Sequence, residues 1–250
     1  MITRHWLKGA RVSSLVFMCC ILAMGALASP ANAQVVQVTR ADARHSIGFS
    51  LGYFAVRGEA ERVEEDVLLA DLSSLTFEIG DFSGFTFGGE WLYGVTDFIE
   101  TGVGLGYYQK NVPTVYRDLV KLDGSEIAQD LKLRIIPITT TIRFLPLGRA
   151  AAVEPYVGAG VGFFNWRYSE IGEFVDENSD TFDGRFIGDG TAVGPVILGG
   201  VRFPAGDAFS AGAEFRWQKA TGDTSNVEGL LGDKIDLGGW TTSFTMHIRF

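Results

Sequence analysis

Nine charged or titratable side chains lie at alternate positions in segments where polar and apolar residues alternate. They are Glu90, Glu100, Arg143, Glu154, Arg202, Glu214, Arg216, His247 and Arg249. Carboxylates and guanidinium groups form strong charge-assisted hydrogen bonds, and a histidine among them can exchange protons. If these groups share one interior they must pair, because an unpaired buried ion costs several kcal/mol. The spacing therefore predicts an ionic network inside a closed structure.

Two interpretations of this network are open at the level of sequence. In the first, the charges only satisfy one another and give the interior a unique packing. In the second, they form a plug that seals the interior to solutes, and in its sharper version the plug is a gate.

An enzymatic interpretation would use His247 with a serine and a carboxylate. Ser243 is on the same face of the segment, but four residues of extended chain separate the two by about 13 Å. A nucleophile and its base must lie within hydrogen-bonding distance. We therefore expect that the protein is not an enzyme. The chain also has no phosphate-binding loop, zinc-ligand spacing or nucleophile elbow, so we expect no cofactor and no metal site.

Two groups of acidic residues lie in long polar connections. They are Glu59, Glu61, Glu64, Glu65 and Asp66 in the first group, and Glu170, Glu173, Asp176, Glu177 and Asp180 in the second. Acid clusters suit divalent cations, but neither group has the spacing of a defined calcium loop. We expect a solvated, self-repelling surface and a short helix over 61–72.

The first 33 residues have the three parts of a secretory signal peptide. A basic start is followed by an apolar run from Leu15 to Leu27 and by the small-residue cleavage signal at 31–33. The run is shorter than the about 20 residues of a membrane-spanning helix. The alternative, a lipoprotein anchored through Cys19 or Cys20, lacks a small residue before the cysteine. We expect a signal peptide at 1–33, an N-terminal segment at 34–45 and one domain at 46–250.

The predicted mature chain is acidic and has no cysteine. Cleavage after Ala33 removes both cysteines and three basic residues, which leaves 217 residues with a net charge of −12. An exported chain of this kind has no disulfide, so packing and hydrogen bonds must stabilise it. Its negative charge makes nucleic acid a poor partner.

Eight segments show the period-two alternation of β-strands. We place them at 46–56, 84–93, 98–108, 131–144, 154–168, 192–203, 208–218 and 238–250. The connections between them alternate in length. Short ones cover 94–97, 145–153 and 204–207, and long ones cover 57–83, 109–130, 169–191 and 219–237. This asymmetry is typical of all-β, eight-stranded antiparallel up-and-down barrels of the outer membrane, which have short periplasmic turns and long external loops.

The two faces of these segments separate a membrane barrel from a soluble one. One face carries large apolar residues and no charge, as in Phe85, Phe87 and Trp91, whereas the other is small, polar or charged. A soluble barrel would have its apolar face inside. Aromatic residues also gather near both ends of the segments, as the two interfacial girdles of a membrane barrel require. Pro137 and Pro195 fit less well, and we expect a β-bulge at each, with a change of phase near Ile135.

Three stretches carry a family resemblance: EPYVGAGVGFFNWRY, GAEFRWQKATGD and the terminal TMHIRF. They resemble small outer-membrane β-barrel proteins of Gram-negative bacteria, the group of OmpW-like barrels and OmpA-like membrane domains. The resemblance covers 46–250. It is specific for architecture and weak for function, because the group includes adhesins, channels for small solutes, anchors and uncharacterised members. It implies a monomer in the outer membrane, in contact with lipid and lipopolysaccharide. The terminal strand would be read by the membrane insertion machinery through Phe244, Met246, Ile248 and Phe250.

The sequence therefore predicts an outer-membrane barrel with a structural or surface-interaction role, long acidic external loops and a lumen closed by charges. The alternative is a narrow, porin-like passive channel for small or hydrophobic solutes.

Overall fold

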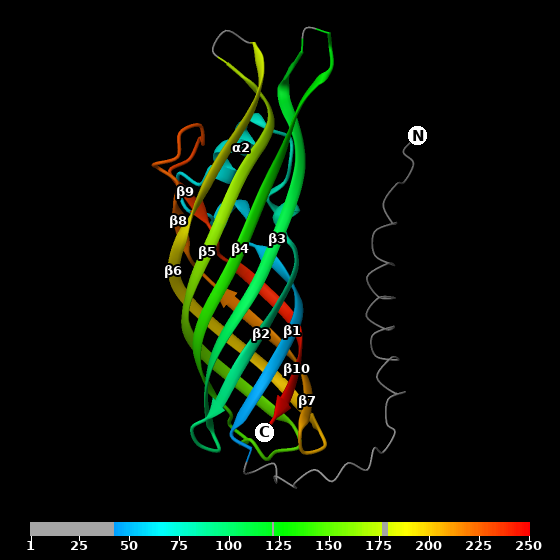
Figure 1. Ribbon diagram of the computed structural model, residues 1–250, viewed down its shortest axis with the longest axis vertical. Helices are drawn as coiled ribbons and strands as arrows, with labels where there is room; N and C mark the ends of the chain where they lie inside the picture. The colour runs from blue at the N-terminus through cyan, green and yellow to red at the C-terminus, as the bar shows by residue number, and fades with distance from the viewer. Residues whose placement is uncertain (1–42, 122, 177–179) are drawn as a thin grey trace, which may run out of the picture. The chain divides into compact units, whose positions relative to one another are not determined.

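The computed structural model describes residues 43–121, 123–176 and 180–250. The predicted signal peptide lies outside these residues. In the described part of the chain, eight long antiparallel strands close into one barrel (Figure 1), which confirms the predicted fold. The strands are β1 (His45–Val56), β2 (Gly84–Gly94), β3 (Ile99–Val120), β4 (Glu126–Phe144), β5 (Glu154–Val175), β6 (Thr181–Ala205), β7 (Phe209–Gln218) and β10 (Gly239–Arg249).

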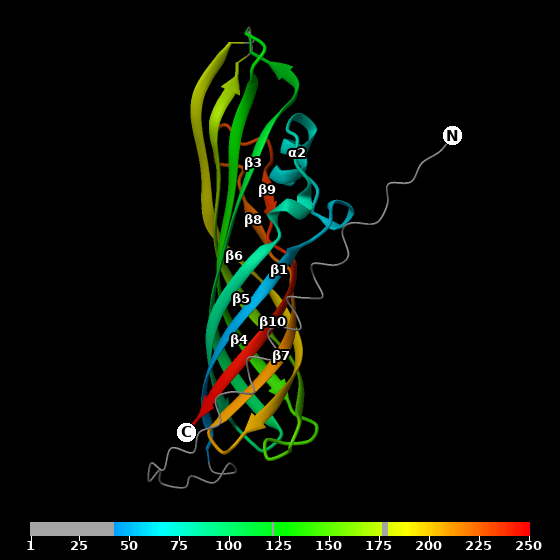
Figure 2. The same ribbon diagram turned by 90° about the vertical axis from the view of Figure 1, so that its right-hand side faces the viewer.

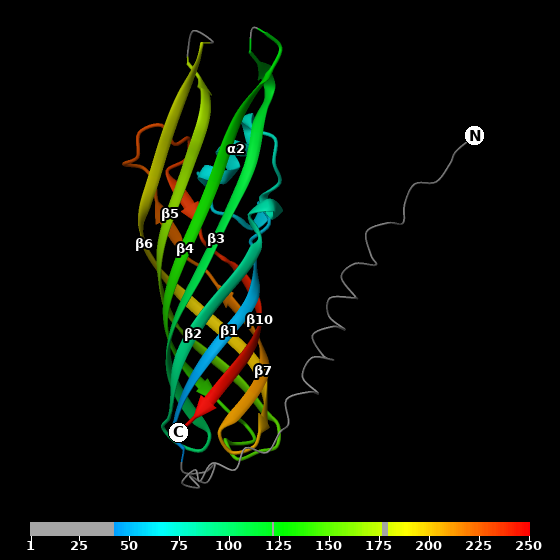
Figure 3. The same ribbon diagram turned by 45° about the vertical axis from the view of Figure 1, so that its right-hand side comes forward.

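The barrel closes where its first and last strands meet. β1 pairs with β10 from Ser46 opposite Arg249 to Val56 opposite Gly239. The connections 95–98, 145–153 and 206–208 lie at one end of the barrel, which we call the short-turn end. The C-terminus lies at the same end (Figure 3). We call the opposite end the hairpin end.

Two of the predicted long loops are in fact strands. β3 continues to Val120 and β4 begins at Glu126, while β5 continues to Val175 and β6 begins at Thr181, so both hairpins extend well beyond the other strands (Figures 1 and 3). The predictions that 109–130 and 169–191 are loops were therefore wrong. Outward positions there are mostly polar or charged, such as Gln109, Asn111 and Asp189, so the apolar alternation ends before the strands do.

The predicted bulges at the two prolines are absent. β4 keeps one register against β5 throughout, and odd-numbered residues of β4 face inward along its whole length. Pro137 interrupts the β3–β4 ladder without shifting it, since pairing stops at Leu105 with Ile138 and resumes at Tyr108 with Ile135. β6 is likewise in continuous register with β5 across Pro195. The phase change was inferred from charges at 132 and 134, which face outward on the extended hairpin.

The outer surface of the barrel is an apolar belt. Its outward side chains are exposed apolar groups on every strand, for example Phe85, Leu105, Ile142, Val157 and Phe244. No helix of the described residues is long and apolar enough to cross a bilayer.

The connection 57–83 folds against the inner face of the long hairpins. It contains two 3₁₀ turns, η2 (Glu59–Glu61) and η3 (Ile79–Phe82), and the helix α2 (Val67–Ser74), which overlaps the helix expected at 61–72 (Figure 2). The connection 219–238 contributes a small sheet of β8 (Thr221–Asp223) and β9 (Lys234–Asp236).

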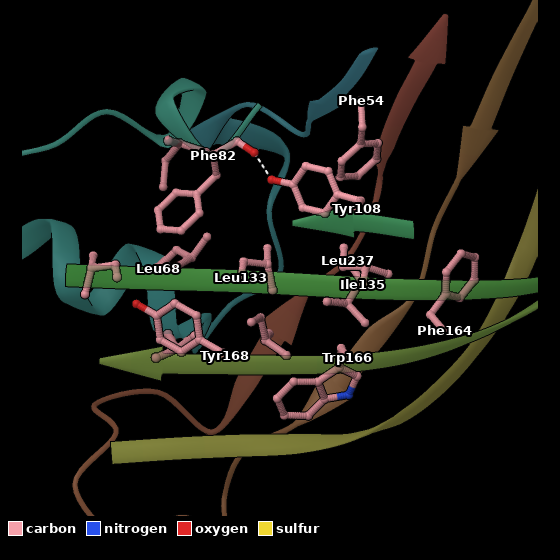
Figure 4. Packing of buried hydrophobic residues seen from close by; sticks show 14 of the residues in the cluster. Phe54, Leu68, Phe82, Tyr108, Leu133, Ile135, Phe164, Trp166, Tyr168 and Leu237 are labelled. Atoms are coloured by element: carbon pink, nitrogen blue, oxygen red, sulfur yellow. Dashed lines mark hydrogen bonds between the residues drawn. The ribbon is translucent and has the colours of Figure 1, made fainter. Parts of the chain in front are cut away.

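These segments close the hairpin end with a buried apolar cluster (Figure 4). Members from the connection 57–83 pack on inward side chains of β3, β4 and β5. The cluster includes Phe54, Leu68, Phe82, Tyr108, Leu133, Ile135, Phe164, Trp166, Tyr168 and Leu237. The Tyr108 hydroxyl donates a hydrogen bond to the Phe82 carbonyl, which fixes the end of the connection to the barrel wall.

Not all acids of this connection are solvated, as the sequence suggested. Asp66 is fully buried, where it pairs with Arg62 and accepts a hydrogen bond of 3.0 Å from the backbone N–H of Asp236. Glu170 of the second acidic group is also buried. The expectation of a uniformly solvated acidic surface was wrong at these positions, because the connections pack on the barrel and bury part of their own charge.

Candidate functional site

The barrel places all nine charged residues singled out in the sequence in its lumen, seven of them near the short-turn end and Glu214 and Arg216 farther along β7. Period-two alternation places them on the inward face, while every second residue joins the apolar belt. Glu100 lies opposite Arg143 in the β3–β4 ladder, and Glu154 lies opposite Arg202 in the β5–β6 ladder. We call the assembly the ionic network.

The first half of the ionic network is centred on Arg143. Its guanidinium group makes a two-pronged contact with Glu90, at 3.0 Å to Oε1 and 2.5 Å to Oε2, and lies 3.2 Å from Glu214 Oε2. Glu90 also contacts His247 Nε2 at 2.8 Å, and Glu214 pairs with Arg216 at 2.8 Å. This geometry gives Arg143 the planar, bidentate partner that suits an arginine.

The second half is centred on two glutamates closer to the turns. Glu100 accepts hydrogen bonds from Arg202 at 2.6 Å and Arg149 at 3.1 Å. Glu154 pairs with Arg249 and lies 3.6 Å from Arg202 Nε. Arg202 therefore contacts both glutamates.

Tyr156 joins the two halves. Its hydroxyl donates a hydrogen bond of 3.0 Å to Glu214, and its ring centroid lies 5.0 Å from the Arg143 guanidinium and 5.1 Å from that of Arg202. Both distances are within the range of cation–π contact. The ring thus contacts an arginine of each half of the network.

Sequence reasoning missed Tyr156 and Arg149. Tyr156 shares the inward phase of Glu154, and that phase was the available signal. Arg149 lies in the short connection 145–153, where period-two alternation gives no orientation. It folds back into the barrel and also donates a hydrogen bond of 2.7 Å to the Ala43 carbonyl.

Glycines on facing strands make room for these side chains. A Cβ atom at Gly48 would lie 2.5 Å from the His247 ring, and one at Gly94 would lie 2.0 Å from the Arg149 guanidinium. Neither distance is possible for a real Cβ atom. The inward glycines that the sequence shows are therefore the complement of the bulky charged groups.

A small chamber lies in the lumen between the ionic network and the apolar cluster. Its volume is about 60 Å³, and its walls include Glu90 and Glu214 of the ionic network and Phe54, Tyr108 and Ile135 of the apolar cluster. The ionic network borders it on one side and the apolar cluster on the other.

The hypothetical catalytic pair is not assembled. His247 contacts Glu90, while the Ser243 hydroxyl lies 3.5 Å from the backbone carbonyl of Glu214. Among the described residues, no group of three or more metal-ligating side chains is arranged to hold an ion.

The closed antiparallel ring, with an apolar outside and a charged inside, defines the class of this protein as a small β-barrel. No protein-family model matches the chain, and no curated protein has a significantly similar sequence.

Several solved outer-membrane barrels are similar to it in structure. OprG of Pseudomonas aeruginosa is 13% identical with a TM-score of 0.48, and the match covers 83% of this chain and 96% of OprG. Neisserial surface protein A is 14% identical, with a TM-score of 0.44 over 82% of this chain and 96% of that protein. The N-terminal barrel of OprF from Pseudomonas aeruginosa is 14% identical, with a TM-score of 0.40 over 83% and 98%.

Proposed function

We propose that the chain is an integral outer-membrane barrel with a structural or surface-interaction role and a closed lumen. The length of the apolar belt supports the membrane location. On β4 the outward residues are apolar or uncharged from Ile136 to Phe144, and on β5 they are so from Pro155 to Phe163. Each of these two spans is nine residues of strand long. A tilted strand crosses a bilayer with about 9–11 residues. Arg134 and Asn165 follow outside the belt.

The observation that carries the closed lumen is the pair of independent closures around one small chamber. The ionic network fills one half with paired charges, and the apolar cluster caps the other half with packed side chains. A solute path would have to break both. Interiors of eight-stranded barrels are just wide enough for side chains to fill.

The orientation follows from the asymmetry of the two ends. Both long hairpins and the apolar cluster lie at the hairpin end, and we place this end outside the cell. Outward side chains on the hairpins are mostly polar or charged, such as Asn111, Lys132 and Asp189, which suits a surface that meets lipopolysaccharide or an external partner.

Planar-bilayer recordings of the wild type and of Glu100→Gln test the closed lumen. We expect both to be silent. A silent wild type with a conducting Glu100→Gln would make the ionic network a gate. A wild type that conducts, or that admits small solutes into liposomes, would overturn the closed lumen in favour of a passive channel.

Cysteine labelling tests the orientation, because the predicted mature chain has no cysteine of its own. Ser125→Cys lies at the β3–β4 turn, and Asp207→Cys is its control at the short-turn end. A membrane-impermeant maleimide added to intact cells should label only the first. Labelling of only the second would place the hairpins in the periplasm.

A further inference from the structure

A second cavity lies at the hairpin end, on the far side of the apolar cluster from the lumen chamber. Its volume is about 210 Å³. Its walls come from α2, β3, β4, β5, β6 and the β8–β9 connection, through residues that include Asp71, Tyr116, Glu170, Phe174, Phe186 and Leu231. We call it the acidic pocket. Sites for drug-sized ligands are about 300–1,000 Å³, so this pocket suits a smaller molecule.

Two buried carboxyl groups form one side of the acidic pocket. Asp71 is 1% exposed and Glu170 is 4% exposed. The two groups are in hydrogen-bonding contact with each other, and the Tyr168 hydroxyl donates a hydrogen bond of 2.6 Å to Asp71 Oδ2. Glu170 Oε1 is buried without a hydrogen-bond partner. A buried acceptor of this kind carries a desolvation cost that a donor in the pocket would remove.

The nearby cations are engaged elsewhere. Arg62 pairs with Asp66, and Lys121 pairs with Glu173 at 2.5 Å. Arg117 donates to the backbone carbonyls of Leu72 and Leu75, at 2.8 and 3.2 Å. On β4, Gln129 donates to the Tyr116 hydroxyl and to the Glu173 carbonyl.

Burial and the mutual proximity of the two carboxyl groups raise their pKa values. Burial, opposed by the hydrogen bond from Tyr168, raises the pKa of Asp71 to about 7. Burial and the neighbouring Asp71 raise the pKa of Glu170 to about 9. The pKa of Tyr168 is raised as well, first by burial and then by Asp71 and Glu170. The pair therefore holds protons near neutral pH and can exchange them for another cation.

Aromatic rings line the other side of the acidic pocket. Phe174 stands edge-on to Phe186 with ring centroids 4.7 Å apart, and Phe182 lies 5.9 Å from Phe174. Faces of aromatic rings attract organic cations, and the attraction is stronger away from water. Acid on one side and aromatic rings on the other match an ammonium group attached to a short apolar body.

We propose that the acidic pocket binds a small organic ammonium ion, with the charged group at Asp71 and Glu170 and the apolar part against Phe174 and Phe186. A bare metal ion fits less well, because the described residues supply only two clustered carboxylates here and no third ligand. The acidic pocket lies at the hairpin end, outside the lumen, so this proposal does not depend on whether the lumen conducts.

Binding should displace a proton, since the ammonium ion pairs with ionised carboxyl groups. With a carboxyl pKa of about 7, about nine-tenths of the group is ionised at pH 8 and about one-tenth at pH 6. Glu170, with a pKa of about 9, is still mostly protonated at pH 8 and releases its proton when the ammonium ion binds. Affinity for an amine that stays charged over this range should therefore be at least tenfold weaker at pH 6 than at pH 8.

Titration calorimetry on the full refolded chain in detergent micelles tests the proposal. The probes are butylamine and 2-phenylethylamine, with butanol as the neutral control, at pH 6 and 8 and in two buffers of different ionisation enthalpy. We expect saturable binding of the amines only, with proton release at pH 8. Glu170→Gln should weaken binding at least tenfold, whereas Glu173→Gln, three residues along the same strand and paired with Lys121, should not.

Circular dichroism and the near-ultraviolet signal of the buried Trp166 establish that each variant is folded. Phe186→Leu keeps both carboxyl groups and should weaken binding of 2-phenylethylamine more than that of butylamine. Absence of saturable amine binding to the wild type, or equal affinity in folded Glu170→Gln, would overturn the proposal.

Discussion

Arg143 lies directly opposite Glu100 in the β3–β4 ladder, yet its guanidinium group pairs with Glu90 on β2 and Glu214 on β7. β7 is three strands away from β4 around the ring. The ion pairs of Arg143 therefore cross the lumen instead of joining neighbouring strands. Glu100 in turn pairs with Arg202 and Arg149. This exchange of partners ties opposite walls of the barrel together.

Replacing Arg143 with Met should destabilise the barrel strongly. The change leaves Glu90 and Glu214 facing each other without the cation between them, and breaking a buried pair costs about 3–5 kcal/mol. Urea unfolding in micelles measures the change in the free energy of unfolding. Arg167→Met is the matched control, because Arg167 is exposed and lies 3.7 Å from the exposed Asp189. Its effect should stay below about 1 kcal/mol, and an equal loss in both variants would contradict the role of the network.

Neighbouring glycines on β6 should differ in their tolerance of alanine. A Cβ atom at Gly200 would lie 2.5 Å from both the Tyr156 hydroxyl and the Ala213 carbonyl, whereas one at Gly199 meets nothing nearer than 3.6 Å. Gly200→Ala should cost about 1–3 kcal/mol by overpacking. Gly199→Ala faces outward and should be neutral within about 0.5 kcal/mol. The same unfolding experiment compares them, and equal stabilities would show that the lumen can relax around Tyr156.

The sequence was sufficient to predict the ring of strands and the inward face on which the nine charged residues lie. Both depend on period-two alternation, which is strong where one face meets an apolar environment and the other a polar one. The same rule failed at Lys132 and Arg134. There the charges face outward because the hairpin has left the apolar belt, and a charge alone does not tell a lumen from open water.

The apolar cluster could not be predicted from the alternation of polar and apolar residues, for a different reason. Its members in the connection 57–83, such as Leu68 and Phe82, follow no strand period, and α2 is only eight residues long. Their burial depends on contacts with β4 and β5, which are distant in sequence. The carboxyl pair of the acidic pocket has the same origin, since Asp71 and Glu170 meet only in the folded chain.

Stability should fall as pH rises through the range where Asp71 and Glu170 ionise. Their pKa values are raised in the fold, to about 7 and about 9, above the ordinary values of 3.8 and 4.5. Groups of this kind contribute stability that is complete below the unfolded pKa and is lost as pH rises through the folded pKa. The free energy of unfolding should therefore decline between about pH 4 and pH 9.

Two variants assign that decline to the pair. Asp71→Asn and Glu170→Gln, measured by urea unfolding across the same pH range, should each flatten it. Glu173→Gln should leave the slope unchanged, because Glu173 has a lowered pKa beside Lys121. A slope that persists in Asp71→Asn combined with Glu170→Gln would assign the pH dependence to other groups.

Deletion of Phe250 should impair membrane assembly more than it impairs stability. The residue closes the barrel seam through two backbone hydrogen bonds with His45, at 2.9 and 3.2 Å, and its ring stacks on the His45 ring with centroids 5.8 Å apart. The ring is otherwise 55% exposed on the apolar belt. Little packing is therefore lost from the interior when the residue is removed, and the free energy of unfolding of the refolded variant in micelles should change by about 1–2 kcal/mol.

Phe209→Ala removes a comparable exposed aromatic ring and serves as the control. If the terminal aromatic is an insertion signal, pulse labelling in cells should show slow assembly only for the Phe250 deletion. Insertion of that variant at the wild-type rate would reduce Phe250 to an interfacial anchor like Phe209.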